Sequence, residues 1–472
     1  MLLLFANQGM LRQNPQVAMD TVNSVISPSA TILPVTPSLH DLRITATYIA
    51  LLPKFPTIAN PPTTQIPPAS PTATSTPDPH VCTFPLAQTT RKEATSQKYT
   101  FSEPQVVLTG DYPDIVGWLP DNQNVIIMPR AAHRFDGIDG SLQTIELFNP
   151  DTKETHIYAT HRNFGEEPLA WNSALNAIIY PAPNVLGVDK TTNRLIVTRQ
   201  IRISDGNPDT TQLLLNNLQD YYPMTFKPDG SQIVYWENNG KQNYKLYRHK
   251  VSHELLEPEQ LIPFDPALFG NEGYSITYDM SWRPNASQLF LYNGGSPTSQ
   301  TLLLDANTGR TCTLDFGGWV YFARWSPNGR YLAVITQKGP MLSSWSDLDL
   351  SVLDGLTGKL YRIDSTKVGP VEMKNCCRHM IGDFSWAPNN RYLIVTGTAG
   401  LTGTTSYVPI DKLYLVDFLS GDVSDLFPSY EFYTDWWGRS LAWSPDGSKI
   451  IAKCPTETEG RLCLVSVQTG RK

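Results

Sequence analysis

The side chains that could carry out catalysis or bind a metal form no complete motif in this sequence. There is no Gly-x-Ser-x-Gly nucleophile turn, no glycine-rich phosphate loop ending in Lys-Ser or Lys-Thr, and no His-Glu-x-x-His zinc helix. His249 and His253 are four residues apart, but they fall on a predicted strand and its exit loop, where this spacing does not converge on a metal. Asp347 and Asp349 lack the further acids and the glycine of a calcium loop. The sequence therefore predicts no metal and no cofactor.

The six cysteines can indicate whether the protein works in an oxidising or a reducing compartment. Cys454 and Cys463 stand at the end and the start of two adjacent predicted strands. One interpretation is a cross-strand disulfide between them, which would indicate an oxidising compartment; the other is two buried free thiols. Two further cysteines are adjacent in sequence, which is too crowded for an ordinary bridge, and no spacing fits a zinc motif. The remaining cysteines are Cys82, Cys312, Cys376 and Cys377.

The composition limits the class of protein. Among 472 residues, 17% are charged and the formal net charge is −7, whereas an average globular chain has about 25% charged residues. This balance excludes the basic surface that a general nucleic-acid binder needs. The 38 prolines, together with 11 tryptophans and 21 tyrosines, argue against coiled coils, helical bundles and enzymes built on Rossmann or TIM-barrel scaffolds.

Residues 1–99 predict a low-complexity, mostly disordered segment. Thirteen of the 38 prolines lie in the first 80 residues, and 14 of the 20 positions from Asn60 to Pro79 are Pro, Thr or Ser. Such a stretch favours extended polyproline II and is typical of a spacer; the alternative is plain disorder without a spacer role. No apolar run approaches the ~18 residues of a membrane helix. Because similar spacers occur in bacterial surface proteins, the expected location is extracellular, at the cell surface or periplasmic, with the cytoplasm as the alternative.

A sequence motif, which we call the phrase, recurs seven times in residues 100–472. Each copy begins with an aromatic anchor residue, continues through a turn containing Pro, Asp, Asn or Gly, and ends in an apolar run. The steps between successive anchors are 53, 55, 56, 43, 61 and 57 residues, which indicates a repeat architecture. The anchors are Trp118, Trp171, Phe226, Trp282, Trp325, Trp386 and Trp443.

Each copy predicts four β-strands. The anchor ends the first strand, and the apolar run after the turn forms the second. A third strand such as Leu348–Leu353 and a short fourth strand such as Lys359–Ile363 complete the unit. Seven four-stranded units predict an all-β fold, a seven-bladed β-propeller, whereas a solenoid would use shorter units or helices.

The last repeat has no predicted fourth strand of its own. Gln105–Thr109, ahead of the first anchor, stands where the fourth strand stands before every other anchor. We expect this N-terminal strand to close the last blade, because pairing removes an open edge that would otherwise promote aggregation. The expected organisation is therefore a tail over residues 1–99 and a propeller over residues 100–472.

Several copies of the phrase resemble a known repeat. Trp443-Ser-Pro-Asp-Gly-Ser-Lys-Ile450 is similar to the TolB-type, WD-like β-propeller repeat, and the copies that begin at Trp325 and Phe226 match it nearly as well. The resemblance covers residues 100–472; it implies the fold and says little about function. The copy at Trp171 departs most, with Asn-Ser-Ala-Leu in place of the proline turn.

The segments that enter each anchor strand supply the candidate binding residues. In a propeller these segments reach one face around the central channel. Because tyrosine and tryptophan dominate interface hot spots, aromatic rings beside carboxylates predict a ligand-binding face; the alternative is that the aromatics only pack between blades. The candidates are Tyr112, Tyr221, Tyr222, Tyr278, Asp279, Trp319, Tyr321, His379, Asp383, Asp435, Trp436 and Trp437.

The leading hypothesis is a non-enzymatic binding scaffold, a monomer with an unknown protein or glycan partner. The alternative is a propeller enzyme, either a glycan lyase or hydrolase or a lactonase, with acids and a histidine around the channel. Two carboxylates would have to lie within about 10 Å of each other to act as general acid and base. The residues of this alternative are Asp220, Asp279, Asp383, Asp435 and His379.

Overall fold

The computed structural model describes residues 94–110, 113–129, 141–163, 169–189, 194–207, 210–218, 223–238, 244–251, 260–263, 279–292, 301–337, 348–368, 381–402, 408–432, 440–454 and 460–470. These residues form β-strands and turns, with one short 3-10 helix, η5 (Ser365–Lys367). Within the same ranges, no helix is long and apolar enough to span a membrane.

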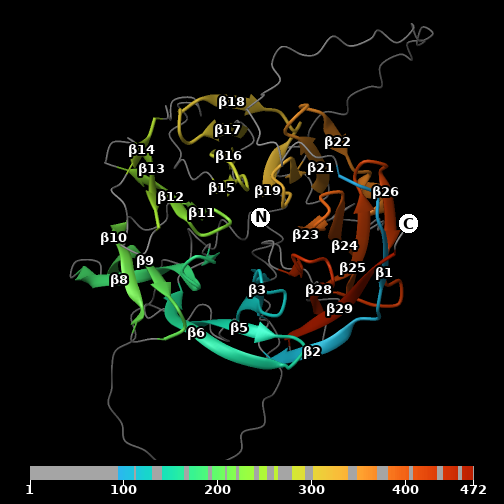
Figure 1. Cartoon of the computed structure of the whole chain (residues 1–472), viewed down its shortest axis with the longest axis horizontal. Helices are drawn as coiled ribbons and strands as arrows, with labels where there is room; N and C mark the ends of the chain where they lie inside the picture. The colour runs from blue at the N-terminus through green and yellow to red at the C-terminus, as the bar shows by residue number, and fades with distance from the viewer. Residues whose placement is uncertain are drawn as a thin grey trace, which may run out of the picture. The chain divides into compact units, whose positions relative to one another are not determined.

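The strands form seven antiparallel sheets that stand as blades in a ring, which confirms the predicted seven-bladed propeller (Figure 1). In each blade the strand that contains the anchor residue is innermost, and the later strands follow outward (Figure 1). Blade 1 contains β3 (Asp114–Trp118), β4 (Val125–Met128), β5 (Ser141–Asn149) and β6 (Glu154–Asn163). Blade 2 contains β7 (Ala170–Asn172), β8 (Ala177–Asp189), β9 (Arg194–Ser204) and β10 (Gln212–Leu218). Blade 3 contains β11 (Met224–Phe226), β12 (Gln232–Asn238), β13 (Tyr244–Lys250) and β14 (Gln260–Ile262).

Blades 4 to 6 repeat this arrangement, and blade 7 contributes three strands in the same order. Blade 4 contains β15 (Asp279–Trp282), β16 (Gln288–Tyr292), β17 (Thr301–Asp305) and β18 (Thr311–Leu314). Blade 5 contains β19 (Trp319–Trp325), β20 (Tyr331–Gln337), β21 (Leu348–Asp354) and β22 (Leu360–Arg362). Blade 6 contains β23 (Ile381–Trp386), β24 (Tyr392–Thr402), β25 (Val408–Asp417) and β26 (Asp422–Asp425). Blade 7 contains β27 (Leu441–Trp443), β28 (Lys449–Cys454) and β29 (Gly460–Gly470).

The N-terminal part of the ring closes blade 7, as the sequence predicts. The outer edge of β29 pairs with β2 (Gln105–Gly110) and, further along, with β1 (Lys98–Phe101), which sequence reasoning missed. Between the two strands, the N–H of Ser102 donates to the carbonyl of Ser466 at 2.9 Å, and the N–H of Ser466 donates to the Ser102 hydroxyl at 2.9 Å. We call β1 and β2 together the clasp.

The core consists of apolar layers between neighbouring blades. Each of the seven buried clusters among the described residues joins two consecutive blades. Val107 of the clasp and Ile115 of β3, for example, belong to the cluster that joins blade 7 to blade 1. Strand β20 is buried along its whole length because a blade covers each of its faces. Burial on both faces explains why the second strand of each blade is a continuous apolar run in the sequence.

Two glycines at equivalent turn positions allow a test of blade packing. Gly309 and Gly421 have left-handed φ angles of +74° and +77°. A Cβ on Gly309 would lie 1.8 Å from the carbonyl oxygen of Pro263 in blade 3, whereas a Cβ on Gly421 would meet nothing within 4 Å. We expect Gly421→Ala to lower the free energy of unfolding by about 1–2 kcal/mol, the cost of the left-handed conformation. We expect Gly309→Ala to lower it by more than about 3 kcal/mol because backbone must also move. Urea denaturation measures both, and equal losses would contradict the contact between blades 3 and 4.

Candidate functional site

Among the described residues, two hairpins extend furthest on the side where loops lead into the inner strands, which we call the entry face. Because successive strands are antiparallel, the loop between the second and third strands of a blade also emerges on this side. β8 and β9 of blade 2 pair as far as Asp189 and Arg194, and β24 and β25 of blade 6 pair as far as Thr402 and Val408. β8 has 13 residues and β24 has 11, against five in β16 of blade 4. At about 3.3 Å per residue, the six to eight additional residues make β24 and β8 roughly 20–26 Å longer than β16.

Four of the twelve candidate residues fall within the described residues. They lie on the inner strands of three consecutive blades: Asp279 on β15, Trp319 and Tyr321 on β19, and Asp383 on β23. The structure therefore brings these four to one arc of the ring. The candidates Tyr112, Tyr221, Tyr222, Tyr278, His379, Asp435, Trp436 and Trp437, together with Asp220 of the enzymatic alternative, lie outside the described residues.

Asp383 is fully buried and connects three blades. Its Oδ2 accepts hydrogen bonds from the backbone N–H and the hydroxyl of Ser440 in blade 7, at 2.9 and 3.0 Å. Its Oδ1 lies 3.2 Å from a guanidinium nitrogen of Arg324 in blade 5 and accepts the N–H of Phe384 at 2.7 Å. Asp383 therefore does not lie on an exposed face, where the sequence analysis placed it. Residues of blades 5, 6 and 7 contact both of its carboxylate oxygens.

Asp383→Asn tests this structural role. An amide cannot accept hydrogen bonds at both positions and cannot balance the charge of Arg324, so we expect the free energy of unfolding to fall by about 2 kcal/mol. The matched variant Asp315→Asn changes an exposed carboxylate on a turn and should cost less than about 0.5 kcal/mol. Chemical denaturation compares the two variants. A similarly small loss of unfolding free energy in both variants would contradict the structural role of Asp383.

Trp319 and Tyr321 also contact the body of the ring. The Trp319 side chain is 7% exposed at the start of β19. Tyr321 lies where the register of β19 and β20 shifts between Val320 and Phe322, and its side chain packs against the core between blades 5 and 6. For these two residues the contacts favour packing, the alternative that the sequence left open.

Asp279 has an exposed side chain at the first position of β15. The surrounding protein nevertheless desolvates its carboxyl group, and this raises the pKa of Asp279 to about 6. A carboxyl group that exchanges a proton near neutral pH can serve as a hydrogen-bonding ligand or as a general acid. Among the four described candidates, Asp279 has the surroundings that best suit contact with a ligand.

The raised pKa makes the effect of Asp279→Asn depend on pH. The native state holds the proton of Asp279 more tightly than the unfolded chain, so this residue lowers stability as the pH rises from about 4 to above 6. We expect Asp279→Asn to raise the thermal unfolding midpoint at pH 8 and to leave it unchanged at pH 4. The gain is small because water also reaches the side chain and screens its charge. An identical shift at both pH values would contradict the raised pKa.

Three anchor tryptophans link neighbouring blades through the same hydrogen bond. The indole N–H donates to the carbonyl of the residue that precedes the anchor of the previous blade, and we call this contact the anchor bond. The donor and acceptor pairs are Trp118 and Ala442, Trp325 and Ser281, and Trp386 and Arg324, at 3.1, 3.2 and 3.1 Å. Trp282 and Trp443 donate instead within the turns of their own blades, to Ala286 and Gly447.

Blade 2 is held to its neighbours in a different way. Within the described part of the chain, the indole N–H of Trp171 has no hydrogen-bond acceptor, and its ring packs 5.9 Å from that of Tyr158. Asn172 replaces the missing proline turn, since its Oδ1 accepts the N–H groups of Ala174 and Leu175, both at 3.0 Å. The Asn172 amide also donates to the carbonyl of Gly230 in blade 3 at 3.1 Å. The divergent sequence of this copy therefore keeps the turn but loses the anchor bond.

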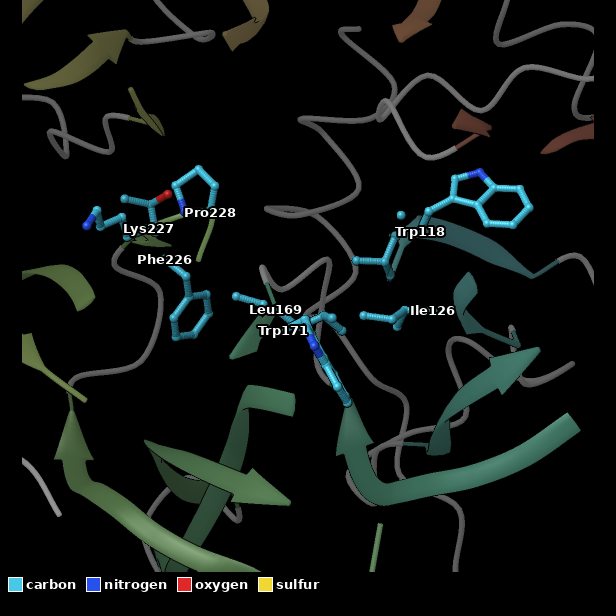
Figure 2. Close-up of a pocket in the computed structure, with 11 residues that line it drawn as sticks. Trp118, Ile126, Leu169, Trp171, Phe226, Lys227 and Pro228 are labelled. Atoms are coloured by element: carbon cyan, nitrogen blue, oxygen red, sulfur yellow. The ribbon is translucent and has the colours of Figure 1, made fainter. Parts of the chain in front are cut away.

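A cavity of about 240 Å³ lies where this anchor bond is missing, and we call it the anchor cavity. Its walls come from the anchor ends of β3, β7 and β11 and from Ile126 of β4. In Figure 2, Phe226 lies on one side and Trp118 and Ile126 on the other, with Trp171 between them. Sequence reasoning did not predict this cavity; the only signal was the departure of the Trp171 copy from the proline turn.

Solved structures similar to this chain include propellers and an enzyme, all at low sequence identity. The Cps50 (Swd1) beta-propeller domain from Myceliophteria thermophila is 12% identical with a TM-score of 0.47, covering 77% of this chain and 100% of that chain. TolB from Acinetobacter baumannii is 14% identical with a TM-score of 0.35, covering 60% and 58%. Oligogalacturonate lyase from Vibrio parahaemolyticus is 10% identical with a TM-score of 0.45, covering 79% and 97%. No protein-family model and no curated protein matches the sequence.

The repeated phrase, the seven blades and the closing N-terminal strands together decide the fold. The chain is a seven-bladed β-propeller. Its ring is closed by a buried ion pair that sequence reasoning missed. The Nζ of Lys453 in blade 7 lies 2.9 Å from Oδ1 of Asp114 in blade 1, and the two side chains are 1% and 4% exposed. A lysine inside the apolar second strand of the last copy was the only sequence signal.

The last blade of the propeller also contains a disulfide. Cys454 of β28 and Cys463 of β29 are bonded, with their Cα atoms 5.9 Å apart, and both side chains are buried. Cys463 stands opposite Val106 of β2, so the bond fastens the strands beside the clasp. Cys312 on β18 is disulfide-bonded as well.

Proposed function

We propose that the propeller is a non-enzymatic scaffold that binds a protein or glycan partner at its entry face. The observation that carries this proposal is the extension of the hairpins β8–β9 and β24–β25, which adds surface on the side of the loops that contain the candidate aromatic residues. Loops held by a rigid frame are a common place for binding residues. The burial of Asp383 among three blades supports binding over catalysis, since it removes one acid from the alternative catalytic set.

The test is to screen the full chain on glycan and peptide arrays. We expect one ligand class to be retained, and the double substitution Trp436→Ala and Trp437→Ala to weaken its binding at least about tenfold, the usual effect of losing hot-spot residues. Leu261→Ala, at an exposed apolar residue of the outer strand β14, is the matched control and should bind normally. Thermal unfolding shows that all three proteins fold. Undiminished binding by the double variant, or no retained ligand, would contradict the proposal.

Asp279 supports a second candidate function, an enzyme that acts on glycans or lactones. An exposed carboxyl group with a pKa of about 6 suits a general acid near neutral pH. The measurement is turnover of polyuronides, neutral glycans and lactones by the full chain. Turnover that Asp279→Asn abolishes, without a loss of thermal stability, would favour the enzyme and overturn the scaffold.

We also propose that the protein is a monomer that works outside the cytoplasm, at the cell surface or in the periplasm. The Cys454–Cys463 disulfide and the bonded Cys312 support this location, because disulfides persist in oxidising compartments. The test is to alkylate the protein in freshly opened cells before reduction and to measure its mass. Alkylated Cys454 and Cys463 would argue for the cytoplasm, and sedimentation analysis measures the oligomeric state.

A further inference from the structure

The anchor cavity lies at the opposite end of the inner strands from the entry face. Gly117 precedes the anchor of blade 1, so it holds the place that the acceptor of an anchor bond holds at three other boundaries. Gly117 and Trp171 both line the cavity, but they do not form this bond. The cavity thus occupies a boundary between blades of the kind that an indole hydrogen bond closes in three other places.

The walls of the anchor cavity combine apolar and polar surface, which suits a neutral group with both an apolar part and a hydrogen-bond acceptor. Ile126, Leu169 and Phe226 supply apolar surface, and Trp171 adds an indole N–H without an acceptor among the described residues. Lys227 also lines the cavity, but its ammonium group lies 3.0 Å from the carboxylate of Asp229. Because this charge is already balanced, the described lining of the site has no free cation to attract an anion, and the indole N–H can donate to a neutral acceptor such as a carbonyl.

The size of the anchor cavity restricts its occupant further. Its volume of about 240 Å³ is below the range of about 300–1,000 Å³ that is typical of sites for whole small molecules. It matches a single large side chain, and aromatic side chains are the usual anchors of protein interfaces. We propose that the anchor cavity binds a phenylalanine or tyrosine side chain of a partner protein, whose adjacent backbone carbonyl accepts a hydrogen bond from the Trp171 indole.

This inference is independent of the function proposed for the entry face, since the two sites share no residue. The first experiment labels the full chain with 5-fluorotryptophan and follows the fluorine resonances of its 11 tryptophans. Trp171→Phe identifies the Trp171 resonance by its disappearance. We expect this resonance to shift saturably on addition of N-acetylphenylalanine amide or N-acetyltyrosine amide, and not on addition of N-acetylalanine amide. No saturable shift, or an equal response to the alanine compound, would overturn the proposal.

The second experiment measures the affinity of N-acetylphenylalanine amide by ligand-observed NMR. Trp171→Phe keeps an aromatic ring but removes the N–H, so we expect the dissociation constant to rise about threefold to tenfold, the value of one hydrogen bond. Trp325→Phe is the matched control, because it removes an anchor bond between blades 4 and 5, far from the cavity. That variant should lower the unfolding midpoint and leave the affinity unchanged. An unchanged affinity in Trp171→Phe, or an equal loss in both variants, would also overturn the proposal.

Discussion

Lys453→Met is expected to lower the free energy of unfolding by about 3–5 kcal/mol, the usual cost of removing one partner from a buried ion pair. Lys453 and Asp114 lie 2.9 Å apart across the boundary between blades 7 and 1 and are almost completely buried. Methionine fills a similar volume but removes the ammonium charge that lies 2.9 Å from the Asp114 carboxylate in a low-dielectric site. The substitution therefore weakens the boundary between blades 7 and 1, where the ring closes. Guanidinium denaturation of the full chain measures the lost free energy of unfolding.

Two variants separate this effect from a general weakening of the same boundary. Lys449 and Asp151 also form an ion pair between blades 7 and 1, but water reaches this pair, since the two side chains are 20% and 50% exposed. Lys449→Met should therefore cost less than about 1 kcal/mol. Adding Asp114→Leu to Lys453→Met should recover most of the lost stability, because an apolar pair often replaces a buried ion pair without cost. Equal losses from Lys449→Met and Lys453→Met, or no recovery in the double variant, would contradict the role given to the buried pair.

The fold could be predicted from the sequence because its signal is local and repeated. Each anchor and its turn form a hairpin whose residues are close in the chain, and seven copies make the pattern stand out from chance. The closing strand Gln105–Gly110 could be placed by its position relative to the first anchor. The second closing strand, Lys98–Phe101, could not be predicted. It has no counterpart in the other copies, and its partner β29 lies at the far end of the sequence.

The candidate site could be predicted only in part, because contacts between blades decide what each residue does. Asp279 and Asp383 both stand three residues before an anchor. Asp383 meets Arg324 of the previous blade and Ser440 of the next blade, so it is neutralised and buried. Around Asp279, Thr225 stands at the position of Arg324 and supplies no cation, and Phe322 stands at the position of Ser440 and supplies no hydroxyl.

Removal of the clasp is expected to abolish the stable ring. A chain that begins at residue 111 lacks β1 and β2, so the 11-residue strand β29 loses its outer partner. It also loses the ring contacts of Tyr99 and Phe101 with Trp443, at 5.1 and 6.3 Å, and the buried Val107. Each fully buried apolar side chain is worth about 1.5–3 kcal/mol. Val107 is buried, whereas Tyr99 and Phe101 are partly buried and each contribute less. The lost contacts and the unpaired edge of β29 together remove a large part of the stability of about 5–15 kcal/mol that is typical of a domain.

The matched control begins at Ala94 and keeps every described contact of the clasp. Circular dichroism and size-exclusion chromatography should show a folded monomer for this chain and aggregated or unfolded protein for the chain that begins at residue 111, because β29 then presents an open edge. A synthetic peptide of residues 94–110, present during refolding, should restore the shorter chain by adding the missing strand to that edge. A cooperative, monomeric fold of the shorter chain without the peptide would show that three strands suffice to close blade 7. In that case the buried pair of Lys453 and Asp114, together with the apolar layer between blades 7 and 1, would have to hold the ring closed without the clasp.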